Sequence, residues 1–265
     1  MKSKISINQF SKILNREKRK IDKIIKNEIV KIKPNVYPAL YNAMEYSLFS
    51  GGKRIRPVIL KWCAETGVPD IEILNKSAAA VEYVHTYSLI HDDLPCMDDD
   101  DFRRGKPSCH KKYSESMAVL AGDALLTEAF NLISRTNKPV LCKVLAESAG
   151  AMGMVGGQAA DIGEEQDVEY INNLKTAQLF KASALMGGIC GNHKHSVLEN
   201  FINYGVNIGK AFQLRDNILD SQTENVITTE KKAEHFIENA KRALEGIRDS
   251  EKLVELTEFI IKREK

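Results

Sequence analysis

An acidic segment followed directly by two arginines is the strongest chemical signal in this sequence. Residues 91–104 read HDDLPCMDDDDFRR, in which six aspartates fall within ten residues. The preceding stretch is mostly apolar or small, and Pro95 disfavours helical geometry at Leu94, so we expect the acids at the end of a buried helix. A helix C-terminus already carries partial negative charge, which makes this arrangement unfavourable until a hard cation binds. Carboxylate oxygens suit Mg²⁺, which takes further ligands from water and substrate phosphates.

A solvated acidic loop that caps a core helix would give the same pattern. Arg103 and Arg104 favour the metal interpretation, because guanidinium groups bind diphosphate oxygens in a bidentate manner. An acidic run followed by arginines is therefore typical of a site for a metal–diphosphate complex. From this segment alone both interpretations remain open.

A second candidate site lies in residues 212–220, which read FQLRDNILD. On a helix, Asp216 and Asp220 are i, i+4 neighbours, and Gln213 shares their face. Two carboxylates and an amide would then point in one direction. Acid pairs at this spacing also occur on ordinary solvent-facing helices, so the pattern alone does not decide between a site and a surface.

A third candidate is the glycine-rich basic segment at residues 51–57, GGKRIRP. The two glycines permit close backbone approach, and Lys53 and Arg56 share one side of a helix that begins here. Such a segment could bind an anion. An ordinary basic turn would have the same composition.

The elements that must position these residues are predicted to be helices. Neither an alternating strand pattern nor an Asn-Gly or Asp-Gly hairpin signal occurs. The sequence predicts an all-α, single-domain helical bundle of about ten helices that spans residues 1–265. Residues 1–33 form a basic amphipathic segment, expected to pack on the protein or to lie on a membrane. Apolar residues recur at helical spacing in 39–48, 58–64, 73–94, 117–133, 140–154, 174–185, 201–219 and 230–262.

Composition narrows the class of protein. The 265 residues are 43% hydrophobic and 28% charged with a net charge of +2, so no global field favours nucleic acid as a partner. The five cysteines form no CxxC pair, which fits a reducing compartment. We expect neither a signal peptide nor a stable membrane insertion, because no segment approaches a span of about 20 apolar residues. The sequence therefore predicts a cytoplasmic protein.

In their order along the chain, these segments resemble the trans-polyprenyl diphosphate synthases. The resemblance runs from about Pro38 to Asp220, includes Lys175 and Thr176, and is closest to bacterial farnesyl diphosphate synthases at residues 85–95, HTYSLIHDDLP. It implies a bundle of helices around a deep central cavity, commonly as a homodimer.

The resemblance also implies a role for each site residue. The metal ligands for Mg²⁺, three ions when diphosphate is bound, would be Asp92, Asp93, Asp98, Asp216 and Asp220. The contacts to isopentenyl diphosphate would be Lys53, Arg56, His85 and Arg104. The groups that act on the allylic substrate would be Arg103 and Lys175, which hold its diphosphate, and Thr176 and Gln213, which line the reacting centre.

The implied reaction joins isopentenyl diphosphate to an allylic diphosphate, dimethylallyl or geranyl, by ionisation, condensation and proton loss. Tyr87 and Ser88 lie one turn before the first acidic motif and would limit the product to farnesyl diphosphate. Geranyl or geranylgeranyl diphosphate remain alternative products. A non-catalytic subunit of a synthase and a terpene cyclase are alternative functions.

Two positions depart from the family pattern. Asn217 stands where the family usually has a second aspartate, so we expect weakened metal binding. Residues 221–229 form a shorter loop than the family's, without its Gly-Lys element. Either the loop is shortened or a segment is missing from the chain, and the first would impair catalysis.

Overall fold

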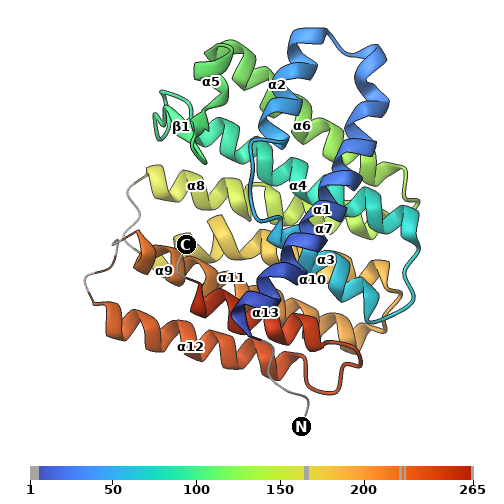
Figure 1. Ribbon diagram of the computed structural model, residues 1–265, viewed down its shortest axis with the longest axis vertical. Helices are drawn as coiled ribbons and strands as arrows, with labels where there is room; N and C mark the ends of the chain where they lie inside the picture. Colours follow the sequence, from blue (N-terminus) through green and yellow to red (C-terminus); the bar gives the residue numbers. More distant parts are fainter. Residues whose placement is uncertain (1–5, 164–166, 221–222, 224, 264–265) are drawn as a thin grey trace. The chain divides into compact units, whose positions relative to one another are not determined.

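The structure is a computed structural model that describes residues 6–163, 167–220, 223 and 225–263. Within these residues the chain is almost entirely helical (Figure 1), which confirms the predicted all-α class. The described part contains thirteen α-helices, somewhat more than the ten predicted, together with one 3₁₀-helix and one π-helix. The α-helices are α1 Ile7–Ile32, α2 Pro38–Leu48, α3 Ile55–Glu65, α4 Ile71–Asp92, α5 Cys109–Lys112, α6 Glu115–Ser134, α7 Pro139–Ala149, α8 Met154–Ile162, α9 Val168–Asn172, α10 Gln178–Cys190, α11 His195–Leu219, α12 Val226–Ala243 and α13 Glu251–Lys262.

Two of the predicted helical stretches are each divided in two. The stretch 230–262 is split between α12 and α13, and Gly246 in their connection has φ 78°, a left-handed backbone that neither helix could contain. The stretch 140–154 is likewise divided, because α7 ends at Ala149 and α8 begins at Met154. Apolar spacing continued across both breaks, so periodicity alone could not locate them.

The chain divides into two compact units, each of which is described by itself. Unit 1 comprises residues 1–16, 59–74 and 143–265, and unit 2 comprises residues 17–58 and 75–142. The predicted single domain and its central cavity stay predictions.

From Ile7 on, the basic N-terminal segment forms the long helix α1, of which residues 17–32 belong to unit 2. Ile21, Ile25 and Ile29 recur every four residues on one face and are fully buried. The apolar stripe is therefore covered by protein, as the packing alternative predicted, and the membrane-surface alternative is not needed to explain it.

Helices α2 and α6 also pack against each other in unit 2.

Two segments, Glu115–Ser134 and Pro139–Ile162, are apolar and long enough to cross a membrane by length and composition alone. The expectation that no segment approaches a membrane span was therefore wrong in that respect. Core helices pass the same test, and α6 buries Leu125, Leu132 and Ile133. Its apolar character is accounted for by packing.

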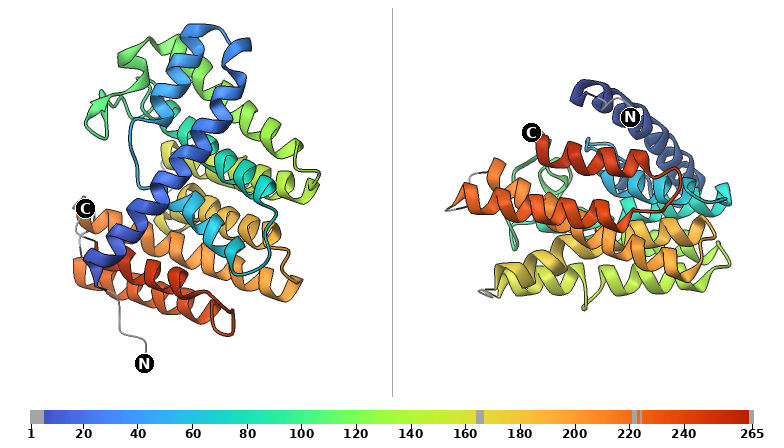
Figure 2. Two further views of the ribbon diagram at one scale, coloured as in Figure 1. Left: turned by 45° about the vertical axis from the view of Figure 1, so that its right-hand side comes forward. Right: turned by 90° about the horizontal axis from the view of Figure 1, so that it is seen from below.

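In unit 1, α11 lies beside α10 and α12 (Figure 2). Close approach of α10 and α11 depends on Gly205, where a Cβ atom would lie 2.6 Å from the Lys181 Cα and 2.8 Å from the Phe180 carbonyl oxygen. Both neighbours are backbone atoms, which cannot rotate away. This contact sets the spacing of the helix that carries the second acidic motif.

Gly205→Ala is expected to destabilise unit 1. Overpacking costs about 1–3 kcal/mol, and backbone overlap favours the upper end of that range, while alanine returns about 1 kcal/mol of helix propensity. The free energy of unfolding in urea, followed by circular dichroism, should fall by about 2 kcal/mol. Asn203→Ala, on the exposed face of the same helix, is the control and should not lower it. Equal stability of Gly205→Ala and the wild type would contradict the packing argument.

Candidate active site

The first acidic motif is folded back on itself at the end of α4, in unit 2. The helix ends at Asp92, two residues before the position where Pro95 was expected to loosen it. The backbone N–H of Asp98 donates to the carbonyl oxygen of Asp92 at 2.9 Å. This turn brings the backbones of Asp92 and Asp98 together, as a metal site shared by these two residues requires.

Asp93 differs from the other predicted metal ligands because it is buried. Its side chain is 4% exposed and forms an ion pair with Arg103, whose Nε donates to Asp93 Oδ1 at 2.8 Å. Burial raises the pKa of the Asp93 carboxyl above its ordinary value, although Arg103 opposes this effect. Asp98, in contrast, is exposed.

The two arginines after the motif lie on a hairpin that the sequence analysis missed. Strands β1 (Phe102–Arg103) and β2 (Lys106–Pro107) pair antiparallel. The turn residues Arg104 and Gly105 both have positive φ, 56° and 75°, as a two-residue type I′ hairpin requires. An Arg-Gly turn lacks the Asn-Gly or Asp-Gly signature, which explains why no hairpin signal was found in the sequence.

Arg104 extends from this turn to the glycine-rich segment. Its Nη1 donates to the Gly51 carbonyl oxygen at 2.6 Å. A Cβ atom on Gly52 would lie 2.5 Å from that same nitrogen. The glycines permit close approach, as predicted, and the group that approaches them in this structure is the Arg104 guanidinium.

His85 lies among several arginines. Its Nε2 is 3.3 Å from Nη1 of Arg56. Burial lowers the pKa of His85 well below its ordinary value, and Arg56, Arg104, Arg54 and Arg103 lower it further. The imidazole is therefore neutral, and Nε2 accepts from Arg56. A neutral histidine surrounded by guanidinium groups forms an environment that favours an anion.

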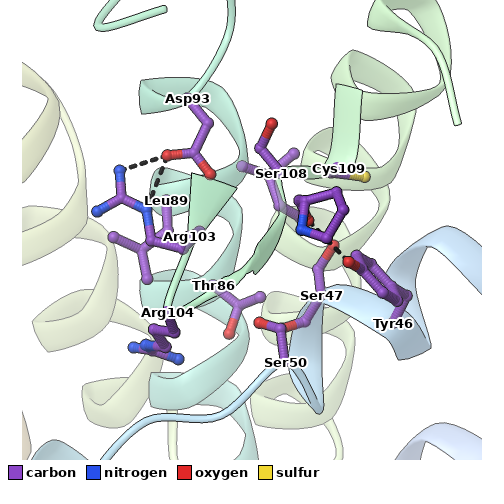
Figure 3. A pocket seen from close by; sticks show the side chains of 12 residues that line it. Tyr46, Ser47, Ser50, Thr86, Leu89, Asp93, Arg103, Arg104, Ser108 and Cys109 are labelled. Atoms are coloured by element: carbon purple, nitrogen blue, oxygen red, sulfur yellow. Dashed lines mark hydrogen bonds and ion pairs between the residues drawn. The ribbon is translucent and has the colours of Figure 1, made fainter. Parts of the chain in front are cut away.

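A small cavity of about 20 Å³ lies next to these groups in unit 2. Figure 3 shows Thr86, Asp93, Arg103 and Arg104 among its lining residues, with Ser50 and Ser108 opposite. The predicted chain-binding cavity stays a prediction.

Tyr87 and Ser88, predicted to limit chain length, face different surroundings. Tyr87 is 5% exposed and its ring packs edge-on against His91, with centroids 5.7 Å apart. Burial and the charge of Asp92 raise the pKa of Tyr87 to about 12, so it is a neutral core aromatic. The Ser88 hydroxyl donates to the carbonyl oxygen of His85 at 3.0 Å. The role in chain length stays a prediction.

In unit 1, a chain of hydrogen bonds joins Thr176 and Gln213, which were predicted to line the reacting centre, to Asn217. The Thr176 hydroxyl donates to Gln213 Oε1 at 2.7 Å, and Gln213 Nε2 donates to Asn217 Oδ1 at 2.9 Å. Thr176 lies in the π-helix Asn173–Ala177, a form that often marks functional sites. Asn217 thus keeps the acceptor that an aspartate would supply, without its charge.

Lys175, the predicted ligand of the allylic diphosphate, is held by a carboxylate of α8. Its Nζ lies 2.6 Å from Asp161 Oδ2, and the Lys175 side chain is 30% exposed. A Cβ atom on Gly157 would lie 2.7 Å from the Lys175 Cα. Gly157 therefore permits close packing of α8 against the π-helix.

The second acidic motif has a partner that the sequence analysis missed. Asp216 and Asp220 lie one turn apart at the end of α11, as predicted. Nη2 of Arg263 forms an ion pair with Asp216 and donates to the Phe212 carbonyl oxygen at 3.2 Å. The guanidinium also lies over the Phe212 ring, 3.9 Å from its centroid. Nothing local in the sequence indicates a contact across 47 residues.

A further group of possible metal ligands lies just beyond the first motif. Ligand atoms of Asp99, Asp101 and His110 are within 4.8 Å of one another, and they are not the aspartates predicted. Lys111 already pairs with Asp101 at 2.7 Å. Asp99 and Asp101 add to the negative charge around the motif, and Lys111 offsets part of it.

The predicted site residues fall into two groups that the structure describes separately. Residues of unit 2 are Lys53, Arg56, His85, Tyr87, Ser88, Asp92, Asp93, Asp98, Arg103 and Arg104, and residues of unit 1 are Lys175, Thr176, Gln213, Asp216 and Asp220. Juxtaposition of the two acidic motifs stays a prediction. Of the loop 221–229, positions 221, 222 and 224 lie outside the described residues, and Asn225 caps α12 by accepting from the Thr228 N–H at 3.0 Å.

Comparison with known proteins identifies the family. Residues 37–248 match the family model of the polyprenyl synthetases. The chain is 40% identical over 233 residues to a farnesyl diphosphate synthase of Geobacillus stearothermophilus, covering 82% of this chain and 76% of the relative. It is 39% identical over 224 residues to a geranylgeranyl diphosphate synthase of Cyanophora paradoxa, covering 79% and 73%. A solved geranyltransferase of Legionella pneumophila superposes with a TM-score of 0.86 at 30% identity, covering 98% of this chain and 99% of that one. The chain belongs to the polyprenyl synthetase family.

Arg263→Gln is expected to ease metal binding at the second motif, because it removes a competing cation from Asp216. If the pair is worth about 1 kcal/mol, the Mg²⁺ concentration for half-maximal activity should fall by roughly fivefold. The measurement is a Mg²⁺ titration of the condensation rate. Arg248→Gln, an exposed arginine of the same unit, is the matched control and should leave the titration unchanged. An unchanged or higher requirement in Arg263→Gln would refute the competition.

Proposed function

We propose that this chain is a magnesium-dependent short-chain prenyltransferase that extends dimethylallyl or geranyl diphosphate with isopentenyl diphosphate, with farnesyl diphosphate as its main product. One observation carries the proposal: a neutral His85 among arginines lies on the same helix that ends in the aspartate motif. The arrangement offers one region for an anion and an adjoining region for hard cations. Relatives named farnesyl diphosphate synthase support this choice of product.

The carboxylates fit Mg²⁺, because hard divalent cations prefer several anionic oxygens. The proposed ligands are Asp92, Asp93 and Asp98 from unit 2 and Asp216 and Asp220 from unit 1, for three ions. When bound, Mg²⁺ neutralises the charge that develops on a departing diphosphate.

The isopentenyl diphosphate would be held by Lys53, Arg56, His85 and Arg104. Since His85 Nε2 accepts from Arg56, the imidazole proton is on Nδ1, and the ring contributes no charge. The binding energy therefore comes from the lysine and the two arginines, with bidentate contacts from the guanidinium groups. These fixed cations would orient the double bond toward the allylic carbon.

Arg103 and Lys175 would hold the allylic diphosphate as it departs. In the structure Arg103 is paired with Asp93 and Lys175 with Asp161, and each pair keeps its cation in a defined position. The Thr176 hydroxyl proton is committed to Gln213, so its oxygen presents lone pairs to a neighbouring cation. Such an oxygen stabilises positive charge without donating a proton.

The reaction balances without a protein nucleophile. The allylic C–O bond breaks and its electron pair leaves with diphosphate, and the isopentenyl double bond then forms a new C–C bond to the allylic carbon. A proton leaves the neighbouring carbon to the released diphosphate, which restores an alkene. Water must be excluded, because it would capture the cation.

We further propose that the protein acts in the cytoplasm as a homodimer and needs neither nucleic acid nor a membrane. Relatives named geranylgeranyl diphosphate synthase make a twenty-carbon product the second candidate. A non-catalytic subunit is disfavoured because Asn217 preserves the hydrogen bond to Gln213.

The test is incubation of the purified protein with isopentenyl and dimethylallyl diphosphates, with Mg²⁺ or with excess chelator, followed by chromatography of the dephosphorylated products. We expect a fifteen-carbon alcohol that disappears when Mg²⁺ is removed. A twenty-carbon product would select the alternative. No product with any allylic starter, from protein with a helical circular dichroism spectrum, would overturn the proposal.

Tyr87→Ala should lengthen the product. Removing the buried ring one turn before Asp92 opens space for further five-carbon additions, so products of twenty carbons or more should become a major fraction. Chain length is read from the same chromatographic assay. Tyr83→Phe, one turn further from the motif on the same helix, is the control and should leave the product unchanged. A Tyr87→Ala enzyme that releases only the wild-type product would remove Tyr87 from this role.

A further inference from the structure

The segment that carries Lys53 and Arg56 has an uncommon backbone. Gly51, Gly52 and Arg54 have φ values of 120°, 109° and 57°. Positive φ is readily adopted by glycine and is uncommon for arginine. A non-glycine residue keeps this conformation when its surroundings hold it there. The surroundings of Arg54 therefore need an explanation.

The side chain of Arg54 is anchored at every guanidinium nitrogen. It is 1% exposed. Its Nε donates to Asp22 Oδ1 at 2.8 Å, and Nη1 donates to Glu82 Oε1 at 2.6 Å. Nη2 donates to the carbonyl oxygen of Leu48, the last residue of α2, which has no partner of its own within that helix. One side chain thus connects α1, α2 and α4 to the segment, all within unit 2.

Arg54 and its two carboxylate partners, Glu82 and Asp22, are all charged. Burial disfavours the charged guanidinium, yet Glu82 and Asp22 outweigh it and raise the pKa of Arg54. Glu82 is itself 2% exposed, so it has no access to solvent as an alternative partner. Separating a buried pair of this kind is strongly unfavourable, because each ion would be left without a partner in a poorly solvated place.

The anchor and the anion-binding groups share one helix face. Glu82 and His85 are three residues apart on α4 and therefore adjacent on its surface. The segment is attached to this face twice, through Arg54 to Glu82 and through Arg56 to His85. The two attachments flank Ile55, and Lys53 precedes the first. Fixing Arg54 thereby fixes the backbone on both sides of it.

We propose that Arg54, through Glu82 and Asp22, is a positioning residue for isopentenyl diphosphate. It touches no substrate. It holds residues 51–57 at a fixed position along α4. Lys53, Arg56 and His85 can then contact the same diphosphate. The inference rests on the proposed function, because it assumes that those three residues bind this substrate.

Glu82→Gln tests the proposal, since it keeps the size of the side chain and removes its charge. Weakening one charge-assisted contact should raise the KM for isopentenyl diphosphate by about tenfold. The kcat and the KM for the allylic substrate should stay within about twofold, because those contacts are not attached to the segment. Glu17→Gln is the matched control: Glu17 is also 2% exposed and lies in unit 2, but it pairs with Lys20. It should change neither KM.

Asp22→Asn decides the matter if Glu82→Gln does not fold. Asp22 is 30% exposed, so its loss should be tolerated and should give a smaller rise, about threefold, in the same KM alone. An unchanged KM for isopentenyl diphosphate in a folded variant, or equal changes in both KM values, would overturn the positioning role. A wild type that consumes no isopentenyl diphosphate would instead overturn the proposed function and this inference with it.

Discussion

Ion pairing inside each unit is the constraint on which the candidate site depends. A site for diphosphate and Mg²⁺ needs many charges of each sign, and burying any of them alone is costly. The structure pairs Asp93 with Arg103, Asp216 with Arg263 and Lys175 with Asp161. These pairs keep the charged groups ordered in the absence of ligand. They also affect how ligands bind, because a group already neutralised by a neighbour binds a new ion only by exchange.

The pairs differ in how easily they can be exchanged. The Arg54–Glu82 pair is almost fully buried, with side chains 1% and 2% exposed, which suits a permanent anchor. The Lys175–Asp161 pair is 30% and 44% exposed, and water can replace either partner at little cost. The degree of burial therefore distinguishes ion pairs that stay formed from ion pairs in which a substrate can replace one partner. By the same criterion, the exposed aspartates of the acidic loop contribute least to the stability of the site.

The helices and the class of reaction could be predicted because both depend on residues that are close together in the sequence. Apolar spacing located α4 and α11, and the order of the aspartate and arginine motifs indicated the family. The contacts that order the site are not local: Arg263 meets Asp216 across 47 residues, and Arg54 meets Asp22 across 32. No periodicity encodes such a contact. The hairpin that carries Arg104 was missed for another reason, since its turn depends on an arginine in a left-handed conformation that propensity disfavours.

Asp93 and Arg103 show how one site can be stable both without and with its ligands. Arg103 could leave Asp93 for a diphosphate oxygen only if the carboxylate gained a cation in return, since a buried carboxylate without a partner is costly. A metal–diphosphate complex offers both signs together, whereas a free metal or a free diphosphate offers one. The pair should therefore favour the complex over either component. The same reasoning applies to the Asp216 pair through its other partner: Asp216 is 35% exposed, but Arg263 is 4% exposed and would be left as a buried cation if a metal ion alone displaced it. On this view the internal ion pairs contribute to selectivity, because they disfavour binding of an incomplete set of charges.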